Sequence, residues 1–343
     1  SMFTGGLPLY ALTGGQYVDS LVAIDPTVVG FALLTLFFGV NLLGLRPAAM
    51  AQVVLFVGLV AALGVFIVFG APAVETTNLT PPFPNGALGV ATAAGVLYFV
   101  TLGANFVVDI GGEVRDATVT IPQSFAISVP LVLLIYVGIG LVAVGAVGAD
   151  AMANQTLAVP AAAFLPGALE PFFVVGGALF AIATSINAVY IITPKYLEVL
   201  AADGLVPGFF ATRNDRFGTA HWGMVAVYVL SVAAILSPLP IAELGSMLGF
   251  GGAFLLIPVM LAALAAIRAD GEAVAAVLPL PPRVVAGMAV LAIPCNALLL
   301  VLLATQSPQV FLVWLGCLAL AGGYYLLRTR SSDLPTPELT PDR

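Results

Sequence analysis

Long apolar runs are the feature that most restricts how this chain can fold. The segments "VVLFVGLVAALGVFIVFGAPAV" (53–74) and "AISVPLVLLIYVGIGLVAVGAVGA" (126–149) contain no charged residue. Each exceeds the roughly 20 residues that a helix needs to cross the ~30 Å hydrocarbon core of a bilayer. Similar runs recur along the chain, of which only 8% is charged, against about 25% in soluble domains. The sequence therefore predicts an all-α polytopic membrane protein.

Hydropathy and helix-breaking residues divide one transmembrane domain, residues 1–330, into about ten helices. The expected ranges are about 3–20, 27–43, 48–70, 87–110, 122–147, 170–200, 221–237, 241–267, 283–303 and 308–327. Residues 331–343 are polar and rich in proline, so we predict a disordered cytoplasmic tail.

Basic residues fall on one side of this helix map. Seven lie in alternate loops and three follow the last helix: Arg46, Arg115, Lys195, Arg213, Arg216, Arg268 and Arg283, then Arg328, Arg330 and Arg343. The intervening loops hold acidic residues or no charge. Because cytoplasmic loops are enriched in Lys and Arg, we expect a cell-membrane protein with both termini in the cytoplasm.

Several other classes of protein are disfavoured. The basic residues are not clustered as nucleic-acid binding requires, so no nucleic-acid partner is expected. Cys295 and Cys317 lie in apolar runs and form neither a disulfide framework nor a metal site. His221, the only histidine, stands beside Trp222 without a partner nucleophile, which favours a role at the membrane interface. We therefore expect no enzyme, cofactor or metal.

The helix expected over 87–110 carries polar groups where lipid-compatible residues should be: Gly103, Asn105 and Asp109. Backbone at membrane depth leaves the helical pattern only where protein or a water-filled cavity supplies partners. A break at Gly103 would expose carbonyl and N–H groups to a bound solute or ion. A carboxylate such as Asp109 in a span also suggests function. The alternative is that Gly103 permits close helix packing and that Asp109 is solvated or paired near the cytoplasmic end.

A second polar cluster, Thr184, Ser185 and Asn187, lies in the middle of the helix expected over 170–200. These residues are candidates for a coupling-ion site or a substrate pocket. Alternatively, the hydroxyl groups bond back to the preceding turn of their own helix or to a neighbouring helix.

Three segments together resemble one family of transporters. "GGEVRDATVTIPQSF" (111–125) is similar to the end of the sixth helix of amino acid–polyamine–organocation (APC) permeases. "ATSINAV" (183–189) with "AADGLVPGFFATRNDRFGTAHW" (201–222) resembles the eighth helix and the loop that follows it. "LLTLFFGVNLLGLRPAAMAQVVLFVGLVAAL" (33–63) looks like the fourth and fifth helices. The resemblance covers almost the whole chain in order and implies the LeuT-like inverted-repeat fold.

The resemblance also implies roles for individual residues. The sixth helix of the family unwinds at the position of Gly103, so Phe99 would be an aromatic gate, and Phe99 and Leu102 would offer carbonyl groups to a substrate ammonium. Ala104 and Asn105 would line the side-chain pocket. Some family members carry a lysine midway along the fifth helix that replaces a coupling cation. This chain has Gly58 and Leu59 there, so the resemblance supplies no such lysine. Other departures are Pro194, where a serine usually precedes the residue that is Lys195 here, and Ala117 and Ala220, where prolines are usual.

The resemblance begins at the third helix of the family, so we expect the first two helices, which grip the substrate carboxylate, to be absent. The predicted function is secondary transport of an amino acid or related organic cation by alternating access, with or without a coupling ion. The alternative is a truncated or split permease chain, or a membrane accessory protein, without transport activity by itself. In that case a second chain would supply the missing two helices.

Overall fold

The computed structural model describes residues 2–83, 85–97, 111, 114–153, 155–237, 239–277 and 280–331. Within these ranges the chain consists of helices and the turns that connect them, without β-strands. The predicted all-α class is confirmed.

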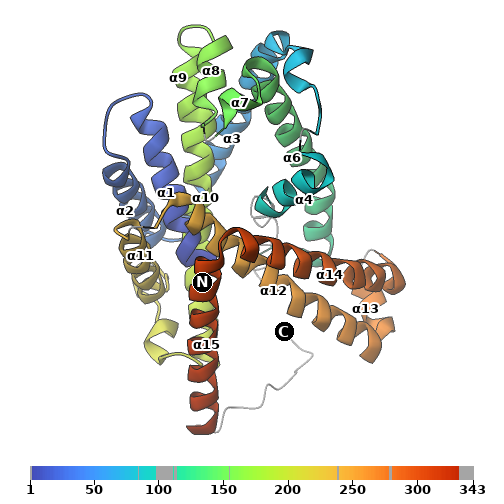
Figure 1. Cartoon of the computed structure of the whole chain (residues 1–343). Helices are drawn as coiled ribbons and strands as arrows, with labels where there is room; N and C mark the ends of the chain where they lie inside the picture. Colours follow the sequence, from blue (N-terminus) through green and yellow to red (C-terminus); the bar gives the residue numbers. More distant parts are fainter. Residues whose placement is uncertain are drawn as a thin grey trace.

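The helices follow one another along the chain as labelled in Figure 1. Their bounds are α1 (Met2–Asp19), α2 (Pro26–Leu42), α3 (Leu45–Gly70), η1 (Ala71–Ala73), η2 (Thr76–Leu79), α4 (Gly86–Leu97), α6 (Ala117–Val147), α7 (Ala149–Met152), α8 (Ala158–Phe164), α9 (Leu169–Phe173), η5 (Val174–Leu179), α10 (Phe180–Ala202), η6 (Gly208–Ala211), α11 (His221–Ile235), α12 (Ile241–Ala269), α13 (Gly271–Val277), α14 (Pro282–Gln306) and α15 (Pro308–Ser331).

Six of the described helical segments are long and apolar enough to cross a membrane. They are Leu45–Ala73, Ala117–Val147, Leu169–Ala202, Glu243–Ala269, Pro282–Gln306 and Pro308–Arg328, and α2 and α11 are shorter apolar helices. Many large apolar side chains on α3, α6, α14 and α15 are exposed, as surfaces that face lipid tails would be. The chain is therefore a multi-pass membrane protein. The count of ten crossings and the LeuT-like arrangement stay predictions.

The structure differs from the expected ranges at the start of α6 and in the connecting segments. Helix α6 begins at Ala117, before the predicted start at 122, because the carbonyl of Asp116 accepts the N–H groups of Val119 and Thr120 and starts the helix there. Pro122 thus lies inside the helix instead of ahead of it. In addition, the connections expected to be loops contain the short helices α7, α8 and α13.

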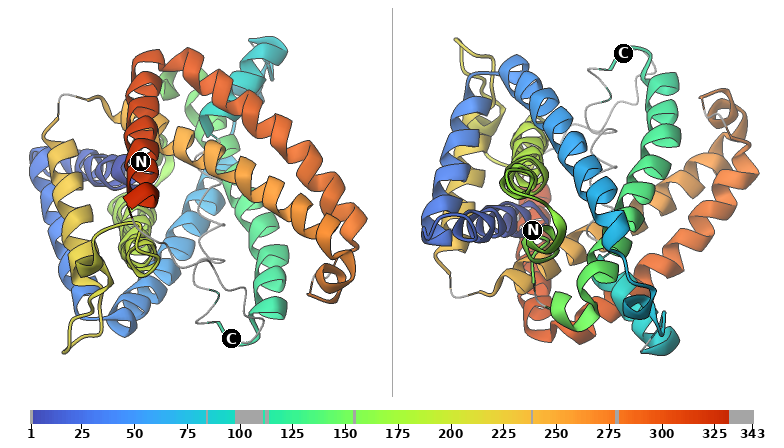
Figure 2. Two further views of the ribbon diagram at one scale, coloured as in Figure 1. Left: turned by 90° about the horizontal axis from the view of Figure 1, so that it is seen from below. Right: turned by 90° about the horizontal axis from the view of Figure 1, so that it is seen from above.

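Helix α10 occupies the centre of the molecule. In the span that contains α10, 56% of the most apolar stretch of 18 residues is buried. In the other five candidate spans, the buried share of this stretch is 11–22%. Figure 2 shows α10 almost end-on, with α1, α2 and α11 on one side and α3 on the other. Ile186, Val189 and Tyr190 of α10 pack into one buried cluster with Leu7 of α1 and Phe37 of α2. Helices α12 and α14 run side by side away from this bundle (Figures 1 and 2).

Several connecting segments lie at two opposite ends of the bundle (Figure 1). At one end, Thr219 donates a hydrogen bond to the Leu42 carbonyl at 3.4 Å, and Arg328 Nε donates to the Gly204 carbonyl at 3.0 Å. The end of α2, the loop after α10 and the end of α15 therefore lie together, and this region contains the basic residues Arg213, Arg216 and Arg328. At the other end, Asn78 donates to the Gly145 carbonyl at 2.9 Å.

Three helices are joined by buried side-chain amides. Asn187 of α10 is fully buried. Its carbonyl oxygen accepts a hydrogen bond from Asn41 Nδ2 of α2 at 2.8 Å. Its own Nδ2 donates to Gln52 Oε1 and to the Ala48 carbonyl of α3 at 2.8 and 2.9 Å. Because a buried amide without partners is costly, this network fixes α2 and α3 against α10.

The network should contribute measurably to stability. In Asn187→Leu, the amides of Asn41 and Gln52 lose a buried partner, which costs about 1–3 kcal/mol for each group left unsatisfied. We expect a clear fall in the thermal unfolding midpoint of the purified protein in detergent. The matched control is Ser231→Ala, because Ser231 is also fully buried but its hydroxyl bonds only to Val227 of its own helix at 2.8 Å. Equal midpoints for the two variants would contradict a role for the network.

The two ends should differ in their access to impermeant reagents. We expect Thr77→Cys to react with a membrane-impermeant maleimide in intact cells and Asp215→Cys to react only after permeabilisation, since both positions are exposed and lie at opposite ends. The background is Cys295→Ser with Cys317→Ser, which removes both native thiols. Labelling of Asp215→Cys from outside intact cells would overturn the predicted orientation.

Candidate functional site

The predicted substrate residues of the broken helix are Phe99, Leu102, Gly103, Ala104, Asn105 and Asp109, and all six lie outside the described residues. The break at Gly103 and the roles of these side chains stay predictions. Helix α4 is described as far as Leu97, and Leu97 contributes to the wall of a large cavity.

This cavity has a volume of about 820 Å³, within the range of about 300–1,000 Å³ typical of small-molecule sites. Residues of α1, α3, α6, η5 and α10 form its wall. Thr184 and Ser185, two of the residues predicted from the sequence, both line it. The structure thus brings them to the wall of one cavity.

The hydroxyl groups of Thr184 and Ser185 have a defined hydrogen-bonding direction. Both donate to the Ala181 carbonyl, one turn earlier on α10, at 2.7 and 3.0 Å. The bond to the preceding turn, considered as an alternative to a pocket role, is therefore present together with the position on the cavity wall. Because the hydroxyl protons are engaged, the oxygen lone pairs are left to accept. Two adjacent acceptors suit an ammonium group or a metal cation.

Asn187 does not belong with the other two residues. It does not line the cavity, and its amide bonds to Asn41, Ala48 and Gln52 as described above. Its carbonyl oxygen and both of its N–H groups already have protein partners. The amide therefore links α10 to α2 and α3. The structure therefore gives no support to the prediction that Asn187 lies in the pocket.

A π-helical turn is the feature that the sequence interpretation missed. The expected continuous helix contains η5, Val174–Leu179, immediately before α10. Gly177 and Ala178 of this turn line the cavity, and a Cβ added at Gly177 would lie 2.9 Å from the Phe173 ring. Single π turns within α-helices often mark functional sites. The signal in the sequence was the pair Gly176–Gly177 in an apolar run.

The position where some family members carry a lysine is closed by packing. A Cβ added at Gly58 of α3 would lie 2.6 Å from the Phe180 ring of α10. A side chain there would require the Phe180 ring or the two helices to shift. Leu59, the next residue, lines the cavity instead.

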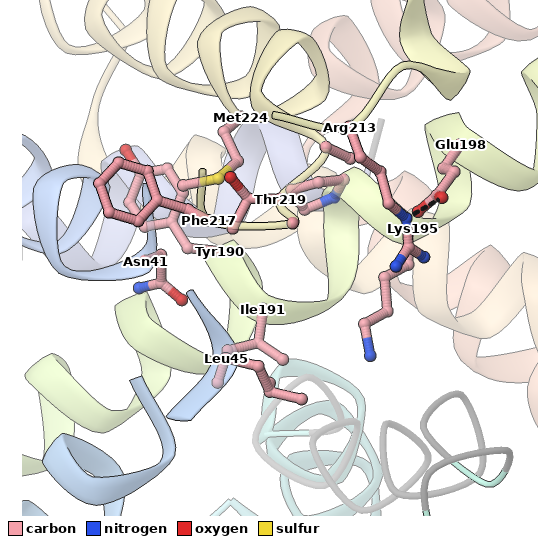
Figure 3. A pocket seen from close by; sticks show the side chains of 13 residues that line it. Asn41, Leu45, Tyr190, Ile191, Lys195, Glu198, Arg213, Phe217, Thr219 and Met224 are labelled. Carbon is pink, nitrogen blue, oxygen red and sulfur yellow. Dashed lines mark hydrogen bonds and ion pairs between the residues drawn. The ribbon is translucent and has the colours of Figure 1, made fainter. Parts of the chain in front are cut away.

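A smaller pocket of about 160 Å³ lies further along α10, at the end where the basic loops gather. Figure 3 shows Glu198 and Arg213 joined as an ion pair, with Lys195 alongside. Arg213 Nε donates to Glu198 Oε1 at 2.6 Å, and the arginine side chain is 62% exposed. Exposed pairs of this kind contribute little to stability, roughly 0–1 kcal/mol. The pair connects α10 to the loop before α11.

Comparison with known proteins identifies the family of the chain. The sequence pattern of the family described as amino acid permease matches residues 2–311. The chain belongs to the amino acid permease family. The resemblance to APC permeases predicted from the sequence is thereby confirmed, and the proteins of this family are transporters.

Three relatives illustrate how distant the known proteins are. Cationic amino acid transporter 3, mitochondrial, of Arabidopsis thaliana is 26% identical over 67% of this chain and 38% of its own length. An uncharacterized transporter of Mycobacterium tuberculosis is 26% identical over 62% of this chain and 49% of its own length. An uncharacterized protein of Methanocaldococcus jannaschii is 25% identical over 53% of this chain and 43% of its own length. The chain thus spans less than half the length of these curated relatives.

Proposed function

We propose that this protein is a secondary transporter that moves an amino acid across the cell membrane by alternating access. Membership of the amino acid permease family supports this proposal. The observation that carries it is the cavity of about 820 Å³, whose wall includes two hydroxyl groups oriented as acceptors. The named relatives include cationic amino acid transporters.

Thr184 and Ser185 would receive the positive end of the solute. A hydroxyl oxygen whose proton is engaged elsewhere can accept a hydrogen bond from an ammonium group or coordinate a coupling cation. In the apolar surroundings of the cavity, such contacts are stronger than in water because the local dielectric constant is lower. We therefore assign these residues to the substrate ammonium or to a coupling ion.

The membrane orientation follows from the charged loops. The end at which the loops after α2 and α10 meet the end of α15 would face the cytoplasm, because it carries basic residues. The smaller pocket with Lys195, Glu198 and Arg213 would then open toward the cytoplasm. Both termini would lie on that side.

The two hydroxyl groups can be tested with closely matched variants. Thr184→Val and Ser185→Ala each remove a hydrogen bond to a charged group, worth about 1.5–3 kcal/mol, so affinity should fall about 10- to 100-fold. The measurement is the rise in unfolding midpoint of the detergent-solubilised protein as amino acids are titrated, followed by uptake of labelled amino acid in cells that express the chain.

The control variants remove a hydroxyl group that donates to a carbonyl of its own helix at a position away from the cavity. Thr305 donates to the carbonyl of Leu302 at 2.7 Å, as Thr184 does to Ala181, and Ser124 donates to the carbonyl of Thr120 at 2.8 Å. Neither lines the cavity. Thr305→Val and Ser124→Ala should bind as the unchanged protein does. Saturable uptake that is unaffected by the Thr184 and Ser185 variants would refute the assigned site, and binding without uptake would favour a chain that needs a partner to transport.

A further inference from the structure

The described wall of the cavity of about 820 Å³ contains no charged side chain. The relatives of the chain nevertheless include a protein named as a cationic amino acid transporter. The described wall is built from aliphatic and aromatic side chains such as Leu59, Leu63, Leu133, Ile139 and Phe173. The polar side chains among these wall residues are all hydroxyls, on Thr13, Tyr17, Tyr136, Thr184 and Ser185. No carboxylate and no basic group belongs to the described part of the wall.

Four of these five hydroxyl groups already have a hydrogen-bond partner in the protein. Thr13 donates to the Leu9 carbonyl at 2.8 Å, and the Tyr17 hydroxyl accepts the Leu157 N–H at 3.4 Å. Thr184 and Ser185 both donate to Ala181. These groups can solvate one ammonium through their lone pairs, but a hydroxyl carries no charge to balance a second cation.

Charged residues on the same helices lie away from the wall. Lys195 is ten residues beyond Ser185 on α10, which corresponds to about 15 Å along a helix. Glu198 of α10 is paired with Arg213. Asp19 of α1 is exposed and follows Tyr17 by two residues, a spacing that directs it to another side of the helix.

We infer that this cavity selects amino acids with neutral, apolar side chains and discriminates against lysine and arginine. The inference rests on the proposed transport of amino acids and specifies the substrate class of the same cavity. A zwitterion brings its own carboxylate to balance its ammonium, so its net charge is zero. A basic side chain adds a second positive charge in apolar surroundings, and such a charge is strongly disfavoured unless a carboxylate pairs with it. The apolar wall, in contrast, gains from covering an aliphatic side chain.

The test compares norleucine with lysine, whose side chains share a four-carbon chain, to which lysine adds a terminal ammonium. Binding to the detergent-solubilised full chain is measured by calorimetry and by the shift in unfolding midpoint. We expect norleucine to bind more tightly than lysine by on the order of a hundredfold. Lysine binding as tight as that of norleucine would overturn the inference while leaving the proposed function intact. Binding of neither ligand would contradict the proposed function, and the inference with it.

Gly140 offers a way to place a carboxylate in the cavity. It lines the wall on α6, and a Cβ added there would have no neighbouring atom within 4 Å. Gly140→Asp should therefore gain lysine affinity, and Gly140→Asn, which has nearly the same shape and no charge, should not. The unfolding midpoints of both variants without ligand show whether they remain folded. Equal lysine affinity in the two variants would contradict the role assigned to wall charge.

A variant of Asp109, which lies outside the described residues, tests whether its carboxylate binds a basic side chain. If the unchanged protein binds lysine tightly, Asp109→Asn reports whether that carboxylate balances the side chain. Loss of lysine binding in this variant, with norleucine binding retained, would replace the inferred selectivity with one set by Asp109.

Discussion

A polar group inside the hydrocarbon region must find its partner within the protein, because lipid tails supply none. This constraint organises the helices around α10. The fully buried amide of Asn187 binds α2 and α3 together through Asn41, Ala48 and Gln52. One turn away, Thr184 and Ser185 satisfy their protons on Ala181 of the same helix. The bonds of Asn187 use all the hydrogen-bonding groups of its amide and fix the neighbouring helices. The bonds of Thr184 and Ser185 use only their protons, so their oxygen atoms can still accept hydrogen bonds at the cavity. The same requirement therefore produces both the scaffold and the candidate site.

The consequences extend to the helices that surround the cavity. With α2 and α3 both fixed against α10, Leu59 and Leu63 of α3 line the same cavity as residues of η5 and α10. The π turn at η5 offsets the register of the span just before Thr184. Gly58 allows α3 to approach the Phe180 ring of α10 closely, since an added Cβ would lie 2.6 Å from that ring. Rigid surroundings of this kind can hold two small hydroxyl groups in a fixed direction, which recognition of an ammonium group requires.

The class of fold could be predicted from the sequence because it depends on the length of the apolar segments. An apolar segment of membrane-crossing length can be identified from the sequence alone, without knowledge of the helices that pack against it. The site was predictable only in part. Thr184, Ser185 and Asn187 stand close together in the chain, but α10 is surrounded on several sides, so neighbouring residues of the cluster face different partners. Which of them meets a cavity depends on the positions of α1, α3 and α6, and a single helix does not encode these. The π turn depends likewise on packing, with Gly176–Gly177 as its only local sign.

The central claim is that an amino acid lies in the cavity between α1, α3, α6 and α10 with its ammonium at Thr184 and Ser185. The most direct measurement is an electron-microscopy map of the full chain in a lipid nanodisc, recorded with a saturating neutral amino acid and compared with a ligand-free map. The account predicts ligand density in this cavity, with the ammonium within about 3 Å of the two hydroxyl oxygens. Density confined to the smaller pocket beside Lys195 and Arg213, with the large cavity unchanged, would contradict it.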